Sequence, residues 1–84
     1  MGKLTDRFVK SAKAGRHGDG DGLYLVVSNT GRRAWVLRYQ VSGERRDMGL
    51  GPFPSISLSE ARRAAFEARK QIHLGKDPIE ARRA

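Results

Sequence analysis

LYLVVSNTGRRAWVLRYQV (residues 23–41) is the stretch that decides the fold, because two runs of alternating side chains flank a turn signal. A period of two over runs of this length indicates β-strands and argues against a helix. The intervening residues 29–31, Asn-Thr-Gly, predict a tight antiparallel hairpin. One face of this hairpin is apolar and carries Leu23, Leu25, Val27, Trp35, Leu37, Tyr39 and Val41.

The register of this hairpin follows from its apolar face. A three-residue loop pairs Ser28 with Arg32 and places Leu25 opposite Trp35, whereas a two-residue loop would turn Trp35 into water. Gly31 then occupies the left-handed position that such a loop requires.

A third strand is predicted over residues 44–50, after a turn at Ser42-Gly43. The helix-facing pairs of this second hairpin are Val41 with Glu44, Tyr39 with Arg46 and Leu37 with Met48. The pairs on the opposite face are Arg38 with Asp47 and Gln40 with Arg45.

A helix follows the strands. Ser57 and Glu60 form a capping-box pattern at its start, and Gly75 and Pro78 mark its end. Its apolar stripe consists of Ala61, Ala65, Ala68 and Ile72, flanked by Leu58 and Ala64. Residues 4–13 predict a further short helix, capped by Thr5 or Asp6. The expected fold is α+β: a three-stranded antiparallel sheet with one C-terminal helix packed on one face.

The segment RHGDGDG (residues 16–22) raises the question of a metal or phosphate loop. It lacks a dinucleotide fingerprint and a Gly-Lys-Ser/Thr signature. A calcium loop is also unsupported, because Leu23 stands where an oxygen ligand belongs. We expect residues 16–21 to be a mobile lead-in to the first strand, with aspartates that shape the turn.

Composition narrows the function. The 84 residues include 17 Lys and Arg against nine Asp and Glu, a net charge of +8, and no cysteine. Five basic residues and one acidic residue fall within residues 1–16. A small domain this basic most often binds a polyanion. With no apolar segment long enough for a signal peptide or a membrane span, we expect a cytoplasmic protein that does not bind membranes.

The sequence contains no recognisable catalytic motif. His17 and His73 have no nucleophile or carboxylate at a recognisable spacing, and two histidines without cysteine do not make a zinc site. We therefore expect no catalytic residues, metal, cofactor or small-molecule substrate in this chain.

The face of the sheet opposite the helix mixes apolar and hydrogen-bonding side chains, as a base-reading surface does. Arginine can pair with guanine, glutamine with adenine, and valine can contact a thymine methyl group. The expected base-reading residues are Tyr24, Val26, Ser28, Val36, Arg38, Gln40 and Arg45, and the expected phosphate contacts are Arg16, Arg32, Arg33 and Arg46. On the other hand, Arg38 and Asp47 could simply form a cross-strand ion pair.

Two alternatives remain. The basic helix could dock a partner protein or a neighbouring subunit through Arg62, Arg63, Arg69 and Lys70. RNA binding is the weaker alternative, because Tyr24 is the single aromatic side chain expected on the open face.

Five motifs in order resemble the amino-terminal arm-binding domain of phage, prophage and genomic-island integrases, which are tyrosine recombinases. They lie within GDGDGLYLVV, WVLRYQV, MGLGPFPSISLSEAR and ARKQIHLGKDP, and the resemblance spans roughly residues 4 to 78. It implies that the sheet enters the major groove of double-stranded arm-type sites, away from the crossover point, for integration and excision of a mobile element.

The same resemblance implies the domain organisation and further partners. Residues 1–78 would form the arm-binding domain, and residues 79–84 would begin a linker to core-binding and catalytic regions absent from this chain. Other integrase subunits and accessory DNA-bending proteins are the further partners it implies. It also implies a bacterial protein that is nucleoid-associated when bound. Phe66 lies away from the alanine stripe and has no assigned role.

Overall fold

A computed structural model of the chain describes residues 2–83, with side chains through Arg82. Four antiparallel strands form one sheet in the order β1-β2-β3-β4. The elements in chain order are α1 (Asp6–Ser11), β1 (Gly15–Gly20), β2 (Leu23–Val27), β3 (Arg33–Val41), β4 (Glu44–Phe53), α2 (Leu58–His73) and α3 (Pro78–Arg83).

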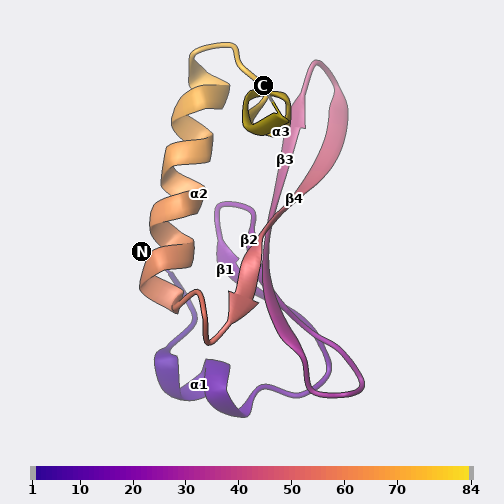
Figure 1. Cartoon of the computed structure of the whole chain (residues 1–84), viewed down its shortest axis with the longest axis vertical. Helices are drawn as coiled ribbons and strands as arrows, with labels where there is room; N and C mark the ends of the chain where they lie inside the picture. The colour runs from indigo at the N-terminus through magenta and orange to yellow at the C-terminus, as the bar shows by residue number, and fades with distance from the viewer. Residues whose placement is uncertain (1, 84) are drawn as a thin grey trace.

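The molecule has two layers. Helix α2 runs along one face of the sheet and leaves the other face uncovered, which we call the open face (Figure 1). Helix α1 lies at one end of these layers, and α3 lies at the opposite end, near the turn between β3 and β4 (Figure 1).

The predicted β2–β3 and β3–β4 registers are confirmed. Leu25 pairs with Trp35, and Gly31 has φ +87°, the left-handed conformation expected of the loop. Arg38 pairs with Asp47, as expected from the turn at Ser42-Gly43.

Strand β4 is longer than the predicted strand over residues 44–50. Gly49 pairs with Val36 and Gly51 pairs with Trp35, so Leu50 is an extra residue in a β-bulge. Because the bulge keeps the pairing going, β4 continues to Phe53 instead of ending at residue 50.

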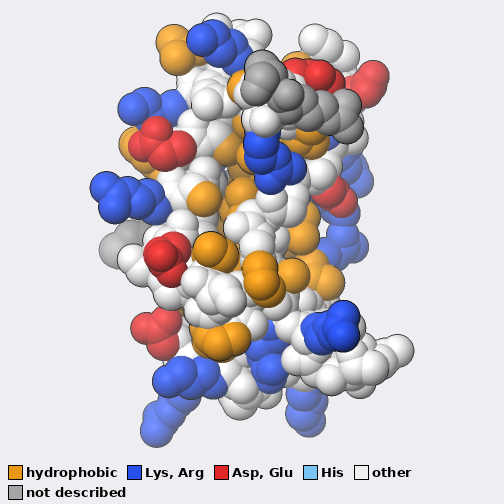
Figure 2. Space-filling model, in the orientation of Figure 1, with side chains coloured by type: hydrophobic (Ala, Val, Ile, Leu, Met, Phe, Trp, Pro, Cys, Tyr) orange, Lys and Arg blue, Asp and Glu red, His pale blue; other side chains and the backbone are white. Residues whose placement is uncertain are grey.

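The core lies between α2 and the sheet. Trp35 is fully buried, donates its indole N–H to Ile56 O at 2.7 Å, and meets the Phe53 ring edge-on. Figure 2 shows apolar side chains along the seam between the two layers. The expected core is confirmed, with Met48 and Leu50 partly buried at its margin, and it gains three residues from the N-terminal segment: Leu4, Val9 and Ala12.

Helix α2 begins as predicted. The Ser57 hydroxyl accepts from Glu60 N at 3.1 Å, and the Glu60 carboxylate accepts from Ser57 N at 2.9 Å, which completes the capping box. Leu58, Ala61, Ala65 and Ala68 are buried, so small side chains allow the helix to lie close to the sheet.

The prediction of three strands is wrong, because residues 15–20 form a fourth strand and not a mobile lead-in. Asp21 and Gly22 both have positive φ, 54° and 88°, and close a two-residue hairpin between β1 and β2. The prediction that Asp21 shapes a turn is thus confirmed, but Asp19 has a different position: it lies at a bulge in β1 and is buried against α2.

The helices near the two ends of the chain are both short. Helix α1 covers residues 6–11 and not 4–13, and Thr5 is its N-cap, with its hydroxyl accepting from Phe8 N at 3.1 Å. Pro78 is the first residue of α3, where proline's missing N–H costs nothing. Within residues 79–84, where we expect a linker to begin, Ile79 packs at the edge of the core.

Candidate nucleic-acid interface

Tyr24 is the centre of the open face. The guanidinium carbons of Arg16 and Arg38 lie 5.7 and 5.8 Å from the centroid of its ring, so two cations lie against it. Arg16 comes from β1, Tyr24 from β2 and Arg38 from β3. Gly18 of β1 faces Tyr24, and a Cβ there would be in ordinary van der Waals contact with the ring, 3.4 Å from Tyr24 Cε1.

Asp47 is the acidic group beside these cations. Its carboxylate accepts from Arg38 Nε at 3.0 Å, so the expected ion pair forms. The hydrogen bond from Arg38 lowers the pKa of Asp47, and the charges of Arg16 and Arg45 lower it further. The Asp47 side chain is half exposed, so water screens this pair, and the pair is weak and can exchange partners.

The other base-reading candidates extend from this centre along the strands. Val26 and Val36 lie on the same face, half-buried, on either side of the β2–β3 pairing. Gln40 and Arg45 form an exposed pair near the β3–β4 turn. Ser28 lies just beyond β2, and its hydroxyl accepts from Arg32 N and contacts the Thr30 hydroxyl, so it supports the loop.

Among the four phosphate candidates, Arg16 and Arg32 are exposed. Arg33 is instead bound within the domain: its guanidinium donates to Val9 O at 2.8 Å, and also to the Lys10, Ala12 and Gly31 carbonyls. The sequence does not distinguish these two adjacent arginines, but in the structure Arg32 is exposed and Arg33 is bound within the domain.

Arg46 is also bound within the domain, on the face that carries the helices. Its guanidinium donates to Asp77 Oδ2 at 2.5 Å, and Tyr39 donates to Asp77 Oδ1 at 2.5 Å. Ile79 N donates to the same carboxylate at the start of α3. Tyr39 and Arg46 hold the pKa of Asp77 below its usual range, while burial raises the pKa of Tyr39. This network fixes α3 to β3 and β4.

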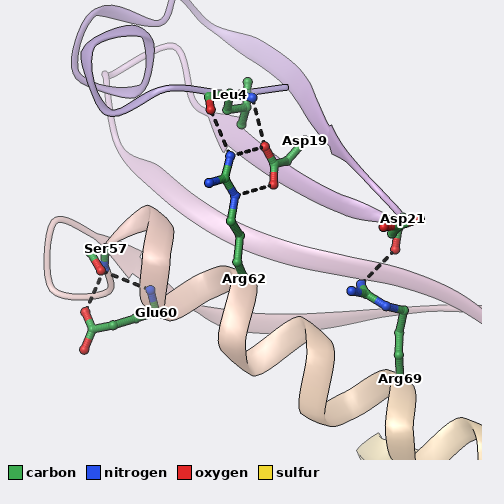
Figure 3. A network of polar contacts seen from close by, with 7 residues as sticks. All are labelled: Leu4, Asp19, Asp21, Ser57, Glu60, Arg62 and Arg69. Atoms are coloured by element: carbon green, nitrogen blue, oxygen red, sulfur yellow. Dashed lines mark hydrogen bonds and ion pairs between the residues drawn. The ribbon is translucent and has the colours of Figure 1, made fainter. Parts of the chain in front are cut away.

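Asp19 anchors the glycine-rich segment, residues 16–22, to the rest of the domain. Arg62 of α2 donates to both Asp19 carboxylate oxygens at 2.9 Å, and Leu4 N donates to Oδ1 at 2.9 Å (Figure 3). The Arg62 hydrogen bonds lower the Asp19 pKa despite burial. The segment therefore ties β1 to α2. Across residues 2–83, no three His, Cys, Asp or Glu side chains lie close enough to hold a metal ion.

The basic helix is largely occupied by contacts within the domain. Arg62 binds Asp19, and Arg69 donates to Asp21 O at 3.2 Å (Figure 3). Lys70 lies over the ring of Phe66, which is more than half exposed. Arg63 is exposed.

Sequence reasoning missed the place of Arg16 beside Tyr24, because it did not predict β1. The signal was the Asp21-Gly22 dipeptide before an alternating run, which is a strong hairpin indicator. Applied there, a two-residue loop brings residues 16–20 alongside β2.

None of the helices among residues 2–83 is long and apolar enough to span a membrane.

Comparison with known proteins places these features in a family. Residues 4–84 match the family described as the arm DNA-binding domain. The integrase of Shigella phage Sf6 and the prophage integrase IntS of Escherichia coli K12 are each 44% identical over 66 residues, covering 79% of this chain and 17% of the relative. The prophage integrase IntA of E. coli K12 is 34% identical over 83 residues, covering 92% of this chain and 20% of the relative. The chain spans about a fifth of the length of these relatives. Since the match covers nearly every residue, the chain belongs to the arm DNA-binding domain family and is homologous to phage and prophage integrases.

Proposed function

We propose that this domain reads arm-type duplex sites with the open face of its sheet in the major groove, within an integrase that integrates and excises a mobile element. The observation that supports this most is the uncovered face, where Arg16 and Arg38 both lie against the ring of Tyr24 while α2 covers the opposite face. A strand pair or small sheet fits a major groove about 12 Å wide.

Each side chain on the open face has a matching group in the groove. Arg38 suits guanine O6 and N7, and Gln40 suits adenine N6 and N7. Val26 and Val36 suit a thymine methyl group. Tyr24 and Arg45 complete the base-reading surface at its centre and at one end, while Ser28, which lies opposite Arg32 at the β2–β3 loop, is at its margin. Because the Arg38–Asp47 pair is weak and exposed, Arg38 can leave Asp47 for a base edge at little cost.

Phosphate contact falls to Arg16 and Arg32, which are exposed on β1 and at the β2–β3 loop. Arg33 and Arg46 support this surface indirectly, because one holds α1 and the other holds α3.

The experiment compares two duplexes: one that the 84-residue chain selects from a randomised pool, and a scrambled duplex of the same composition. Arg38→Ala should weaken binding to the selected duplex about tenfold to a hundredfold and leave the scrambled one nearly unchanged. Arg32→Ala should weaken both equally and reduce the salt dependence.

Arg63→Ala on α2 is the matched control, since it removes the same charge from the opposite side of the molecule. Equal losses on both duplexes for Arg38→Ala would refute groove reading. A loss for Arg63→Ala as large as that for Arg38→Ala would favour docking through the helix.

A further inference from the structure

At the α1 end, Arg33 joins a short helix to a hairpin loop. From β3 its guanidinium donates to Val9 O at 2.8 Å, Lys10 O at 3.0 Å and Ala12 O at 3.1 Å. Its Nη1 also donates to Gly31 O at 3.1 Å. The last carbonyls of a helix lack partners within the helix, and a cation there is favoured by the helix dipole. Arg33 thus fixes the C-terminal end of α1 against the β2–β3 loop.

This contact brings positive charges together. Lys10 belongs to the capped turn, Lys13 follows Ala12, and Arg32 follows Gly31, and all three side chains are exposed. Figure 2 shows Lys and Arg side chains at this end of the molecule. The acidic residue of α1, Asp6, is in the opposite turn and interacts electrostatically with Arg62.

We propose that Lys10, Lys13 and Arg32 form a backbone-binding surface that grips phosphates flanking the groove, and that Arg33 is its positioning residue. This inference rests on the proposed function, because it assigns the surface to the same duplex that the sheet reads.

The position of this surface suits flanking phosphates better than bases. Arg32 precedes Arg38 by six residues, which is about 20 Å along a strand at roughly 3.3 Å per residue. That exceeds the groove width of about 12 Å, so in the proposed docking, with the strands laid across the groove and Arg38 over the bases, this end lies over the sugar–phosphate backbone. Lysine is suited to phosphate as a point charge on a flexible stem.

Lys10→Ala/Lys13→Ala tests the surface without disturbing the Arg33 bonds, which go to backbone carbonyls. Removing two phosphate contacts should reduce the slope of log affinity against log salt by about 1.8. The affinity ratio between 50 and 200 mM salt should then shrink about tenfold, equally on the selected and scrambled duplexes. Arg63→Ala/Lys70→Ala is the matched control on α2 and should keep the wild-type slope.

Arg33→Lys tests the positioning role. Lysine keeps the charge but cannot bridge the same four carbonyls, so the salt slope should fall as in the double lysine variant. Adding Arg33→Lys to Lys10→Ala/Lys13→Ala should then reduce the slope no further. A wild-type slope for Arg33→Lys, with circular dichroism showing a folded protein, would refute the positioning role.

The two proposals fail differently. Suppose that Lys10→Ala/Lys13→Ala keeps the wild-type salt slope while Arg38→Ala weakens binding to the selected duplex. The flanking surface is then refuted and groove reading stands. Suppose instead that Arg38→Ala binds the selected duplex with wild-type affinity while Lys10→Ala/Lys13→Ala reduces the salt slope. Groove reading is then refuted and the flanking surface stands.

Discussion

Replacing Arg62 by alanine removes the partner of a carboxylate that is 4% exposed. Asp19 would keep one hydrogen bond, from Leu4 N, and would lose two charge-assisted bonds of 2.9 Å. Leu4 O would also lose its bond from Arg62 Nη2. The strand β1, the N-terminal segment and α2 meet at this carboxylate, so the variant loosens all three.

The cost follows from these contacts. Breaking a buried ion pair from one side costs about 3–5 kcal/mol. The Arg62 side chain is 39% exposed, so water can replace part of what is lost, and we expect about 3 kcal/mol. For a domain of this size that corresponds to a fall in Tm of about 12–24 °C.

Urea and thermal unfolding followed by circular dichroism measure this cost. Arg63→Ala, one residue along the helix and exposed, removes the same charge and should change stability by less than about 0.5 kcal/mol. If Arg62→Ala and Arg63→Ala unfold at the same urea concentration, the reasoning about Asp19 is refuted.

The same pair makes stability depend on pH. The pKa of Asp19 is lowered in the folded protein, chiefly by the Arg62 hydrogen bonds, from about 3.9 in the unfolded chain. Its stabilisation is therefore complete above about pH 5 and is lost as the pH falls through the folded pKa. Arg62→Ala should flatten the decline of unfolding free energy below pH 4.

Three further changes have defined outcomes. Gly22→Ala should lower the free energy of unfolding in urea by about 2–4 kcal/mol, because a Cβ there would lie 2.3 Å from Arg38 O. Gly31→Ala is the control: Gly31 has nearly the same φ but no atom within 4 Å of its Cβ position, so the loss should be about 1–2 kcal/mol. Equal losses for the two variants would contradict the close-contact argument. Asp77→Asn should speed amide hydrogen exchange in α3 while leaving β2 protected, and unchanged exchange in α3 would show that the Tyr39 and Arg46 contacts do not hold it. Asp47→Asn should raise affinity for the selected duplex several-fold, since it removes a negative charge from the open face and releases Arg38 for a base edge, and an unchanged affinity would count against contact between that face and the DNA.

The register of strands β2 to β4 could be predicted from the sequence, because it follows from the alternation of apolar and polar side chains along these strands. Leu25 opposite Trp35 followed from parity, because a slip of one residue would expose Trp35. The capping box of Ser57 and Glu60 was predictable because it depends only on two residue types three positions apart.

Strand β1 could not be predicted in this way, because Gly-Arg-His-Gly-Asp-Gly has neither alternation nor strand propensity. Besides its pairing with β2, it is held by the bond between Asp19 and Arg62, which are 43 residues apart. The candidate site shows the same division: the open-face residues followed from register, but Arg32 and Arg33 differ through a tertiary contact with α1 that no local pattern reveals.

An amide chemical-shift titration of the 84-residue chain with the selected duplex tests the central claim most directly, because it locates the bound DNA on the fold. The account predicts the largest shifts on the open face, at Tyr24, Val26, Val36 and Arg38, with Arg63 and Lys70 of α2 nearly unmoved. Shifts concentrated on the exposed side of α2, with the open face unmoved, would contradict it.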